Sequence, residues 1–211
     1  MKPQLGSPTL NIGDNSSCTA KDQRGLTRPQ FSTCDLGAVE VKNTAVCMVT
    51  TTGTNQGDGS NWSNQAMTLT AALSTPDCEE IWVKKGTYYP TSGTDRTISF
   101  TILPNTRLLG GFSGNENDPN DRDINANPVI LSGDIGATGL QTDNSYHVVT
   151  LNGTQGQPIL PDTTLSDLII QDGYTSTGTL DFPNNSGAGL FCDGSGNGNE
   201  CSPSLHNVEF R

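Results

Sequence analysis

The sequence Thr164-Leu165-Ser166-Asp167-Leu168-Ile169-Ile170 is a short apolar run, and seven similar runs accompany it between residues 81 and 210. The eight runs span residues 81–83, 98–103, 107–112, 129–133, 146–151, 164–170, 188–192 and 205–210. They are rich in β-branched, aliphatic and aromatic residues and are separated by polar segments with Gly, Pro and Asn, which is typical of short strands joined by turns. No helical pattern lies between them. The sequence therefore predicts an all-β fold.

The loops between these runs favour one of two all-β architectures. A β-sandwich joins many neighbouring strands by tight hairpins, for which a two-residue Asn-Gly or Asp-Gly turn is the strongest signal. Here Asn152-Gly153 and Asp172-Gly173 each follow a single run and lead into long polar loops. Long loops suit the coils of a solenoid, so we expect a parallel β-helix. The alternative is a β-sandwich, which antiparallel pairing between adjacent strands would indicate.

One helix is expected, at about residues 61–73. Ser60 or Asn61 is a suitable N-cap, and the polar residues 50–59 before it are expected to form a loop. Apolar residues follow at helical spacing, namely Trp62, Ala66, Leu69, Ala72 and Leu73. Such an amphipathic helix can lie across the open end of a solenoid and cover strand edges. We therefore expect residues 42–80 to form an N-terminal cap and residues 81–211 to form the coils.

The composition limits both the core and the partners of this chain. Apolar residues make up 32% of the 211 residues, against about 45–50% in typical globular domains, so a thick two-layer core is not expected. The 22 acidic and 11 basic residues give a formal net charge of −11, which repels nucleic acid and anionic membranes. The sequence has no apolar run near the ~18 residues of a membrane span. Neither nucleic-acid binding nor membrane insertion is expected.

The six cysteines form three pairs of sequence neighbours: Cys18 with Cys34, Cys47 with Cys78, and Cys192 with Cys201. Six cysteines allow 15 pairings, and proximity favours this one. No pair has the Cys-x-x-Cys spacing of a zinc or thioredoxin site, so disulfides are favoured over metal. Each is expected to stabilise the fold by roughly 3 kcal/mol and to indicate an oxidising, extracytoplasmic location. Because no signal peptide follows Met1, the numbering is expected to begin on a mature or excised fragment.

Two parts of the chain resemble opposite ends of one protein family. Residues 7–14 (SPTLNIGD), 22–25 (DQRG) and 34–40 (CDLGAVE) resemble the carboxy-terminal tail of secreted bacterial "choice-of-anchor Q" proteins. Residues 57–62 (GDGSNW), 81–91 (IWVKKGTYYPT), 96–116 (RTISFTILPNTRLLGGFSGNE) and 164–174 (TLSDLIIQDGY) resemble the amino-terminal cap and coils of the same kind of protein. That likeness spans nearly all of residues 47–211. The resemblance implies a right-handed parallel β-helix of the polymorphic-outer-membrane-protein type, preceded by a tail segment at residues 1–41.

No catalytic constellation is evident. The sequence lacks Gly-x-Ser-x-Gly, His-Glu-x-x-His and phosphate-loop motifs, and His147 lies in an apolar run, where it is expected to occupy one face of a coil. The candidates for a carboxylate pair are five aspartates, namely Asp134, Asp143, Asp162, Asp167 and Asp172. Each adjoins a small or turn-forming residue, where Asp commonly stabilises a turn. We therefore assign no catalytic residue and no cofactor, and expect that the protein is not an enzyme.

Residues 115–123 carry the candidate metal site. Four acids lie within nine residues, namely Glu116, Asp118, Asp121 and Asp123, and oxygen ligands at short spacing suit calcium. The segment lacks the central Gly and distal Glu of an EF-hand, and Arg122 is a competing internal partner. A solvated loop with Arg122 bridged to a neighbouring acid is the favoured alternative.

Aromatic residues provide a weak indication of sugar binding. Trp62, Trp82, Tyr88 and Tyr89 have rings able to stack on sugars. However, Trp62 lies on the apolar face of the expected helix and Trp82 lies in the first run, so both are expected in the core.

These features favour an extracellular or cell-surface structural protein. We expect head-to-tail assembly into a filament, sheath or surface layer, with residues 1–41 of one copy completing the open β-helix end of the next by strand addition. The expected partners are other copies of the chain, with cell-surface polysaccharide as a further candidate. The alternatives are a polysaccharide-active enzyme and a carbohydrate-binding or adhesin module. A tandem array is also open, in which residues 1–41 close a preceding unit of a longer polypeptide.

Overall fold

The computed structural model of this chain divides into two compact units, residues 1–44 and residues 45–211. It describes residues 9, 12–23, 28–29, 33–39, 46–153, 157–175, 182–195 and 199–211. The boundary expected after residue 41 lies outside these residues. Among the described residues, no helix has the length and apolar character needed to cross a membrane.

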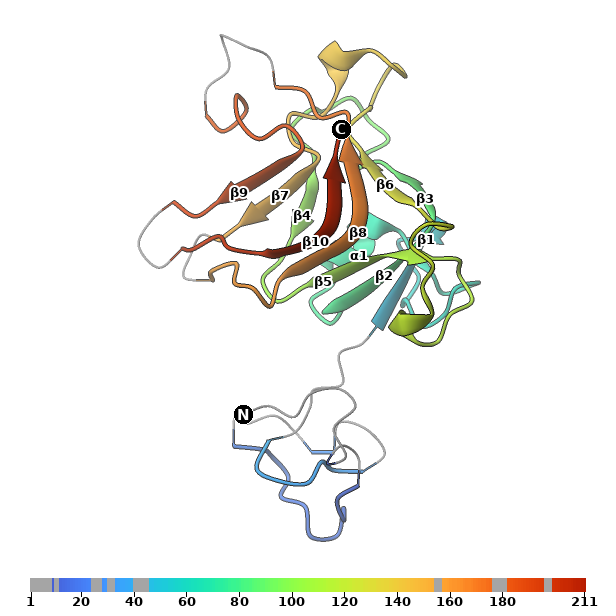
Figure 1. Cartoon of the computed structure of the whole chain (residues 1–211), viewed down its shortest axis with the longest axis vertical. Coiled ribbons are helices and arrows are strands. Elements are labelled where there is room, and N and C mark those ends of the chain that lie inside the picture. The colour runs from blue at the N-terminus through green and yellow to red at the C-terminus, as the bar shows by residue number, and fades with distance from the viewer. Residues whose placement is uncertain are drawn as a thin grey trace. The chain divides into compact units, whose positions relative to one another are not determined.

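The described part of the second unit consists of ten strands, one α-helix and two short 3-10 helices (Figure 1). In chain order they are β1 (Val46–Thr54), α1 (Leu69–Ser74), β2 (Glu80–Lys84), β3 (Gly86–Tyr88), β4 (Phe100–Ile102), β5 (Arg107–Phe112), η1 (Pro119–Asp121), β6 (Val129–Ser132), η2 (Gln141–Asp143), β7 (Val149–Asn152), β8 (Thr164–Gln171), β9 (Leu190–Asp193) and β10 (Ser204–Phe210). All eight expected runs contain a strand, which confirms the all-β class.

Every pairing between these described strands is parallel. One ladder aligns β1, β2, β5, β8 and β10, and another aligns β4, β7 and β9. A third aligns β3 and β6 with the carboxy-terminal half of β8. The chain visits these ladders repeatedly, so the parallel sheet curls as a solenoid does. The antiparallel pairing that a sandwich requires is not found among the described strands.

The registers stack apolar side chains into continuous columns. Ile81, Leu108 and Leu165 occupy the same position on β2, β5 and β8, and each is 0% exposed. A second column contains Leu131 of β6 and Ile170 of β8, which are also fully buried. Since each residue of a column packs on the residue one coil away, a core forms with few apolar residues per coil. This arrangement accommodates the low apolar content of the sequence.

β8 bends at a corner, so that its first half pairs with β5 and its second half with β6, and β10 bends at the matching position. Asp167 and Asn207 hold φ angles of 61° and 49° at this corner, in the left-handed region that bends the chain and that Asp and Asn tolerate better than most residues. Asn207 Nδ2 donates to Asp167 Oδ1 at 3.0 Å, which joins the two corners. On the other neighbouring coil, a Cβ at Gly110 would collide with the carbonyl oxygen of Asp167. Only glycine permits this approach of the two backbones.

The expected helix at residues 61–73 is wrong in its first half. The helix α1 begins only at Leu69, with Thr68 as its N-cap. Asn61 Oδ1 instead accepts the N–H groups of Ser63 and Asn64 at 3.0 and 3.1 Å. A side chain that bonds to nearby backbone in this way competes with the helix, so the periodicity of the apolar residues was misleading here.

Two strands were missed. β1 continues to Thr54, through residues expected to form a loop, because the β-branched run Val49-Thr50-Thr51-Thr52 extends alongside its neighbours. β3 is only three residues long, and it pairs with β6. Neither strand has enough apolar alternation to be recognised locally.

Residues 55–74, here called the cap, cover the outer edge of β1. Met48 N donates to Gly59 O at 2.9 Å, and Thr54 N donates to Ala66 O at 3.0 Å. The helix buries Leu69, Ala72 and Leu73 against the core. Residues 42–80 were expected to cover this end with a helix at about 61–73, but turns and bends of residues 55–66 make these two bonds and the helix is limited to Leu69–Ser74.

Candidate functional site

At the opposite end of the coil stack, two column positions are exposed to solvent in the described part of the chain. In the stacked columns, Leu205 and Phe210 of β10 take the positions that Leu165 and Ile170 hold on β8. Leu205 is 41% exposed and Phe210 is 50% exposed, whereas the two β8 residues are 0% exposed. The same column positions therefore change from buried to exposed within one coil.

The backbone of β10 is paired on one edge. Ser204 N donates to Thr163 O at 2.9 Å, and Arg211 N donates to Ile170 O at 3.0 Å. Among the described strands, β10 pairs with β8 alone (Figure 1). We call β10 with its exposed Leu205 and Phe210 the open end. An unpaired parallel edge of this kind is a template for a further strand.

The first unit carries exposed apolar groups of its own. Its described residues are held by the Cys18–Cys34 disulfide and by a hydrogen bond from Gly13 N to Cys34 O at 2.7 Å. Ile12 is 61% exposed and Leu36 is 52% exposed. The resembling stretch of residues 34–40 is described only as far as residue 39.

The expected disulfides are all present: Cys18–Cys34, Cys47–Cys78 and Cys192–Cys201. The second joins β1 to the segment before β2, and the third joins β9 to the segment before β10. Three disulfides indicate a protein of an oxidising, non-cytoplasmic compartment.

The expected calcium ligands make local hydrogen bonds with the backbone. The Glu116 carboxylate accepts the N–H groups of Ser113, Gly114 and Asn115 at 2.7, 2.9 and 3.0 Å. Burial opposes its ionisation, but these bonds outweigh burial and lower the pKa of Glu116 from its usual 4.5 to about 2.

The other acids of this loop also stabilise turns. Asp118 accepts the N–H of Asn120 at 2.8 Å, and Asp123 accepts the N–H of Ala126 at 3.0 Å. Glu116, Asp121 and Asp123 line one open hollow. Within the described part of the chain, no three His, Cys, Asp or Glu side chains are placed to hold a metal ion. Calcium at these four acids gains no support from this arrangement and stays a prediction.

Arg122 forms its ion pair with a residue distant in the sequence. Its Nη1 lies 3.0 Å from Asp167 Oδ2 and also donates to Gly110 O at 3.2 Å. The guanidinium group lies over the Phe112 ring, 5.6 Å from its centroid. The expected bridge between Arg122 and a neighbouring acid of the loop is therefore replaced by a bond to the corner of β8.

The aspartates considered for catalysis also have structural partners. Asp134 accepts the N–H of Gly139 at 2.9 Å, and Asp143 accepts the N–H of Ala137 at 2.8 Å. Asp172 accepts from Ser132 Oγ at 2.9 Å. Asp162 is exposed. The contacts of Asp134 and Asp143 are local and agree with the expected turn-stabilising role, whereas Asp172 bonds to a residue of another coil.

Residues 143–147 form a largely buried polar segment, of which only Asp143 and His147 were considered from the sequence. Its unpartnered atoms, within the described part of the chain, are Asp143 Oδ1, Asn144 Oδ1, Ser145 Oγ and His147 Nε2. His147 stacks on Phe191 with ring centroids 4.9 Å apart, and its Nδ1 lies 3.1 Å from Gly187 O. Buried polar atoms of this kind are commonly satisfied by ordered water. Sequence patterns carry no signal for such a segment.

The tryptophans belong to an aromatic cluster. The Trp82 ring stacks on Phe112 with centroids 4.8 Å apart, and Trp62 lies 5.5 Å from Phe112. Trp62 Nε1 donates to Glu116 O at 3.0 Å. Trp82 is 4% exposed, in agreement with its expected place in a core. Trp62 is only partly buried and precedes α1, so its expected place on the apolar face of a helix is wrong.

The chain was also compared with known proteins. It matches no family model, no curated protein and no solved structure. Its function is therefore inferred from the geometry of the chain itself.

Proposed function

We propose that this protein is an extracellular structural protein, a right-handed parallel β-helix that assembles head to tail. The observation that carries the proposal is the exposure of Leu205 and Phe210 at column positions that are fully buried one coil earlier. Burial of a Leu or Phe side chain stabilises by roughly 1.5–3 kcal/mol. A strand added to β10 gains this apolar burial together with backbone hydrogen bonds.

Residues 1–41 of a second copy are the proposed occupant of the open end. Direct stacking of β10 on the β1 of another copy is blocked, because the cap already bonds to the outer edge of β1. Residues 1–44 form a unit of their own, and their exposed Ile12 and Leu36 provide apolar surface for docking. The arrangement is a form of strand addition in trans.

A contact of this type can be repeated from one copy to the next. It is heterologous, since the docking segment and the open end are different surfaces, and such contacts make a filament unless the rotation closes a ring. The three disulfides suit an oxidising exterior, and the net charge of −11 disfavours nucleic acid and anionic membranes as partners. In a tandem polypeptide, the same docking joins one unit to the next.

The oligomeric state of the oxidised full chain tests the proposal. Sedimentation velocity over a range of concentrations is expected to give a series of growing species, with linear or ring-shaped particles in electron micrographs. The double variant Leu205→Ser/Phe210→Ser and a deletion of residues 1–41 are each expected to shift the protein to monomer. Leu140→Ser is the matched control, since Leu140 is 49% exposed and is not part of β10.

Cross-linking identifies the surfaces involved. In a mixture of isotopically light and heavy chains, a zero-length carboxyl–amine reagent is expected to join a lysine within residues 1–41 of one copy to Glu209 of β10 in another. A monomer at all concentrations, or assembly that survives both the double variant and the deletion, would overturn the proposal. Loss of assembly in Leu140→Ser as well would also contradict it, because the effect would then not be specific to the open end.

A further inference from the structure

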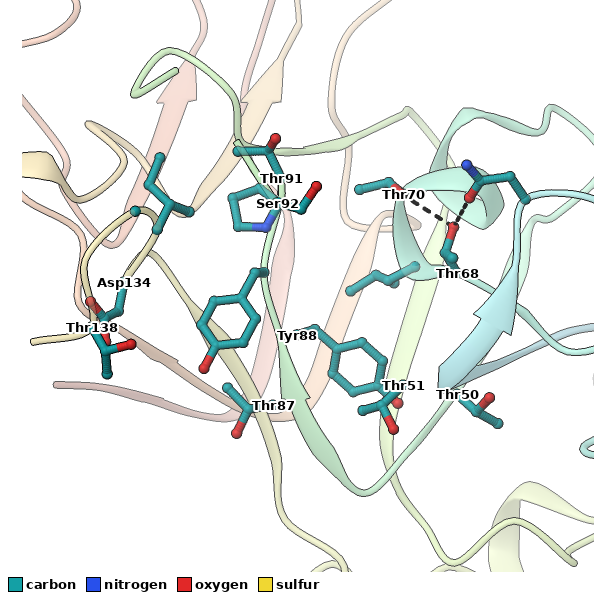
Figure 2. A pocket seen from close by; sticks show the side chains of 16 residues that line it. Thr50, Thr51, Thr68, Thr70, Thr87, Tyr88, Thr91, Ser92, Asp134 and Thr138 are labelled. Atoms are coloured by element: carbon teal, nitrogen blue, oxygen red, sulfur yellow. Dashed lines mark hydrogen bonds between the residues drawn. The ribbon is translucent and has the colours of Figure 1, made fainter. Parts of the chain in front are cut away.

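A groove of about 610 Å³ lies where the cap meets the first coils (Figure 2). Its lining comes from residues 50–55 of β1 and the start of the cap, residues 68–70, residues 87–92 and residues 134–138. These segments are distant in the sequence and are brought together by the parallel ladders and the cap. The groove is remote in sequence from β10, so its chemistry does not depend on the proposed assembly.

Hydroxyl groups dominate the lining of this groove. Figure 2 labels seven threonines or serines on the β1 side, at the start of α1 and along the β3 side, with Thr138 beyond them. Within the described part of the chain, the hydroxyls of Thr51, Thr87 and Ser92 have no hydrogen-bond partner. By contrast, Thr68 Oγ1 donates to Asn55 Oδ1 at 2.5 Å. Several donors and acceptors are thus left for a ligand.

One aromatic ring is available beside these hydroxyls. Tyr89 is 49% exposed, while its neighbour Pro90 and the facing Ile135 are buried and supply an apolar floor. Tyr88 is different: its hydroxyl donates to Lys84 O at 2.6 Å, and burial raises its pKa. Tyr89 is therefore the ring that can stack on a ligand, and Tyr88 is part of the wall.

The groove carries almost no charge. Asp134 is the one carboxylic acid among its described lining residues, and both carboxylate oxygens accept the N–H of Gly139. The same described lining contains no Lys or Arg. An anionic ligand would find no cation here and would also be repelled by the net charge of −11. The lining chemistry selects a neutral ligand that is rich in hydroxyl groups.

The groove adjoins a second hollow, so the surface available to a ligand is longer than one sugar unit. An adjoining hollow of about 510 Å³ shares Thr70 and Pro90 with it and adds the exposed apolar residues Ile98 and Leu103. Adjoining hydroxyl-rich and apolar surfaces suit the polar edges and apolar faces of linked sugar rings.

We propose that this groove binds a neutral oligosaccharide of several units, with Tyr89 stacked on one sugar ring and the free hydroxyls of Thr51, Thr87 and Ser92 bonded to others. Pockets with an exposed aromatic ring and a few convergent polar groups are typical ligand sites. The site requires the cap, because residues 55–70 provide one of its walls.

Calorimetric titration of the full chain with cellohexaose, xylohexaose, chitohexaose and hexagalacturonate tests the proposal. At least one of the three neutral hexaoses is expected to bind with a saturable isotherm, and hexagalacturonate is expected not to bind. Tyr89→Ala is expected to weaken binding about tenfold, through the loss of stacking. Thr87→Val, which keeps the shape but removes the hydroxyl, is expected to weaken it about fivefold.

Two variants serve as controls. Tyr89→Phe keeps the ring and is expected to bind within about twofold of the parent. Phe182→Ala removes an aromatic side chain that is 65% exposed and lies outside the groove, so it is expected to bind as the parent does. The proposal fails if no neutral hexaose binds, if Tyr89→Ala binds as tightly as the parent, or if hexagalacturonate is the preferred ligand.

Discussion

The two ends of the coil stack differ in whether the outer edge of the terminal strand is hydrogen-bonded and covered. At the β1 end, the cap donates and accepts backbone hydrogen bonds along the edge, and α1 buries three apolar side chains. At the β10 end, Leu205 and Phe210 are 41% and 50% exposed and the edge is unpaired among the described strands. Both ends have the same parallel register, so the difference comes from the covering segment and not from the strands.

This asymmetry means that the burial of a side chain in a column depends more on whether a coil lies on each side of it than on which amino acid it is. A Leu on β8 has a coil on each side, while a Leu at the same position on β10 has a coil on one side only. Nearest-neighbour dependence of this kind is general for repeat proteins. The same substitution is therefore expected to have different effects at the two positions.

The largest expected effect contrasts two leucines of one column. Leu165→Ala is expected to lower the free energy of unfolding by about 2–5 kcal/mol, because it opens a cavity between two coils. Leu205→Ala is expected to cost less than about 1 kcal/mol in the monomer, since the side chain is 41% exposed. Denaturant unfolding of dilute protein measures both. Equal losses would mean that the open end is covered within the monomer.

The disulfides offer a second contrast between the ends. Cys47→Ser/Cys78→Ser is expected to cost roughly 2–4 kcal/mol, and Cys192→Ser/Cys201→Ser about 1 kcal/mol less, because the sequence separations are 31 and 9 residues. The first pair is also more deeply buried, so its serines lose more packing. Thermal unfolding of the two double variants gives the order. A larger loss at the β10 end would contradict this account.

Substitution of two arginines is expected to give a smaller difference in stability, between an ion pair inside the stack and one at the open end. Arg122→Gln is expected to cost about 1.5–3 kcal/mol, because it leaves the Asp167 carboxylate, whose side chain is 10% exposed, without its cation. Arg211→Gln at the open end is expected to cost about 0–1 kcal/mol, since Arg211 and Glu209 are both more than half exposed. Unfolding at low and high salt is the measurement. A strong salt dependence for the Arg122 pair would indicate that it is more solvated than its burial implies.

The smallest expected effect concerns the loop that supports Trp62 of the cap. Because the pKa of Glu116 is lowered from 4.5 to about 2, its carboxylate contributes stability in full above pH 4.5 and loses that contribution as the pH falls towards 2. Glu116→Gln is expected to be about 1 kcal/mol less stable than the parent at neutral pH. The difference between them is expected to shrink between pH 4.5 and pH 2. A difference that is constant with pH would contradict the lowered pKa.

Much of the local structure was predictable. The eight apolar runs each contain a strand, and the three disulfides join cysteines that are neighbours in the sequence. The first half of the predicted helix does not form, because the Asn61 side chain accepts hydrogen bonds from the backbone N–H groups of a turn. The spacing of apolar residues gives no information about such a bond. β3 was not predicted because a strand of three residues is too short to show an alternation of apolar and polar residues.

The proposed sites were much less predictable. The bond between Arg122 and Asp167 joins residues from different coils, and the sequence near Arg122 pointed to nearer acids. The groove beside Tyr89 combines four distant segments, so its uncharged, hydroxyl-rich lining has no local signature. The contrast between Leu165 and Leu205 is likewise invisible in two similar strand sequences.

The sequence by itself determined the all-β class, the positions of eight of the ten described strands and the disulfide pairing, because these depend on side-chain type and on spacing along the chain. Only the tertiary structure decided which coil positions stack, which strand edge the cap covers and which one stays open. The physical reason is that parallel pairing is long-range: each ladder bond joins residues separated by a whole coil, and loops of unequal length conceal the register. Burial, and with it the surfaces available for assembly or binding, depends on that register.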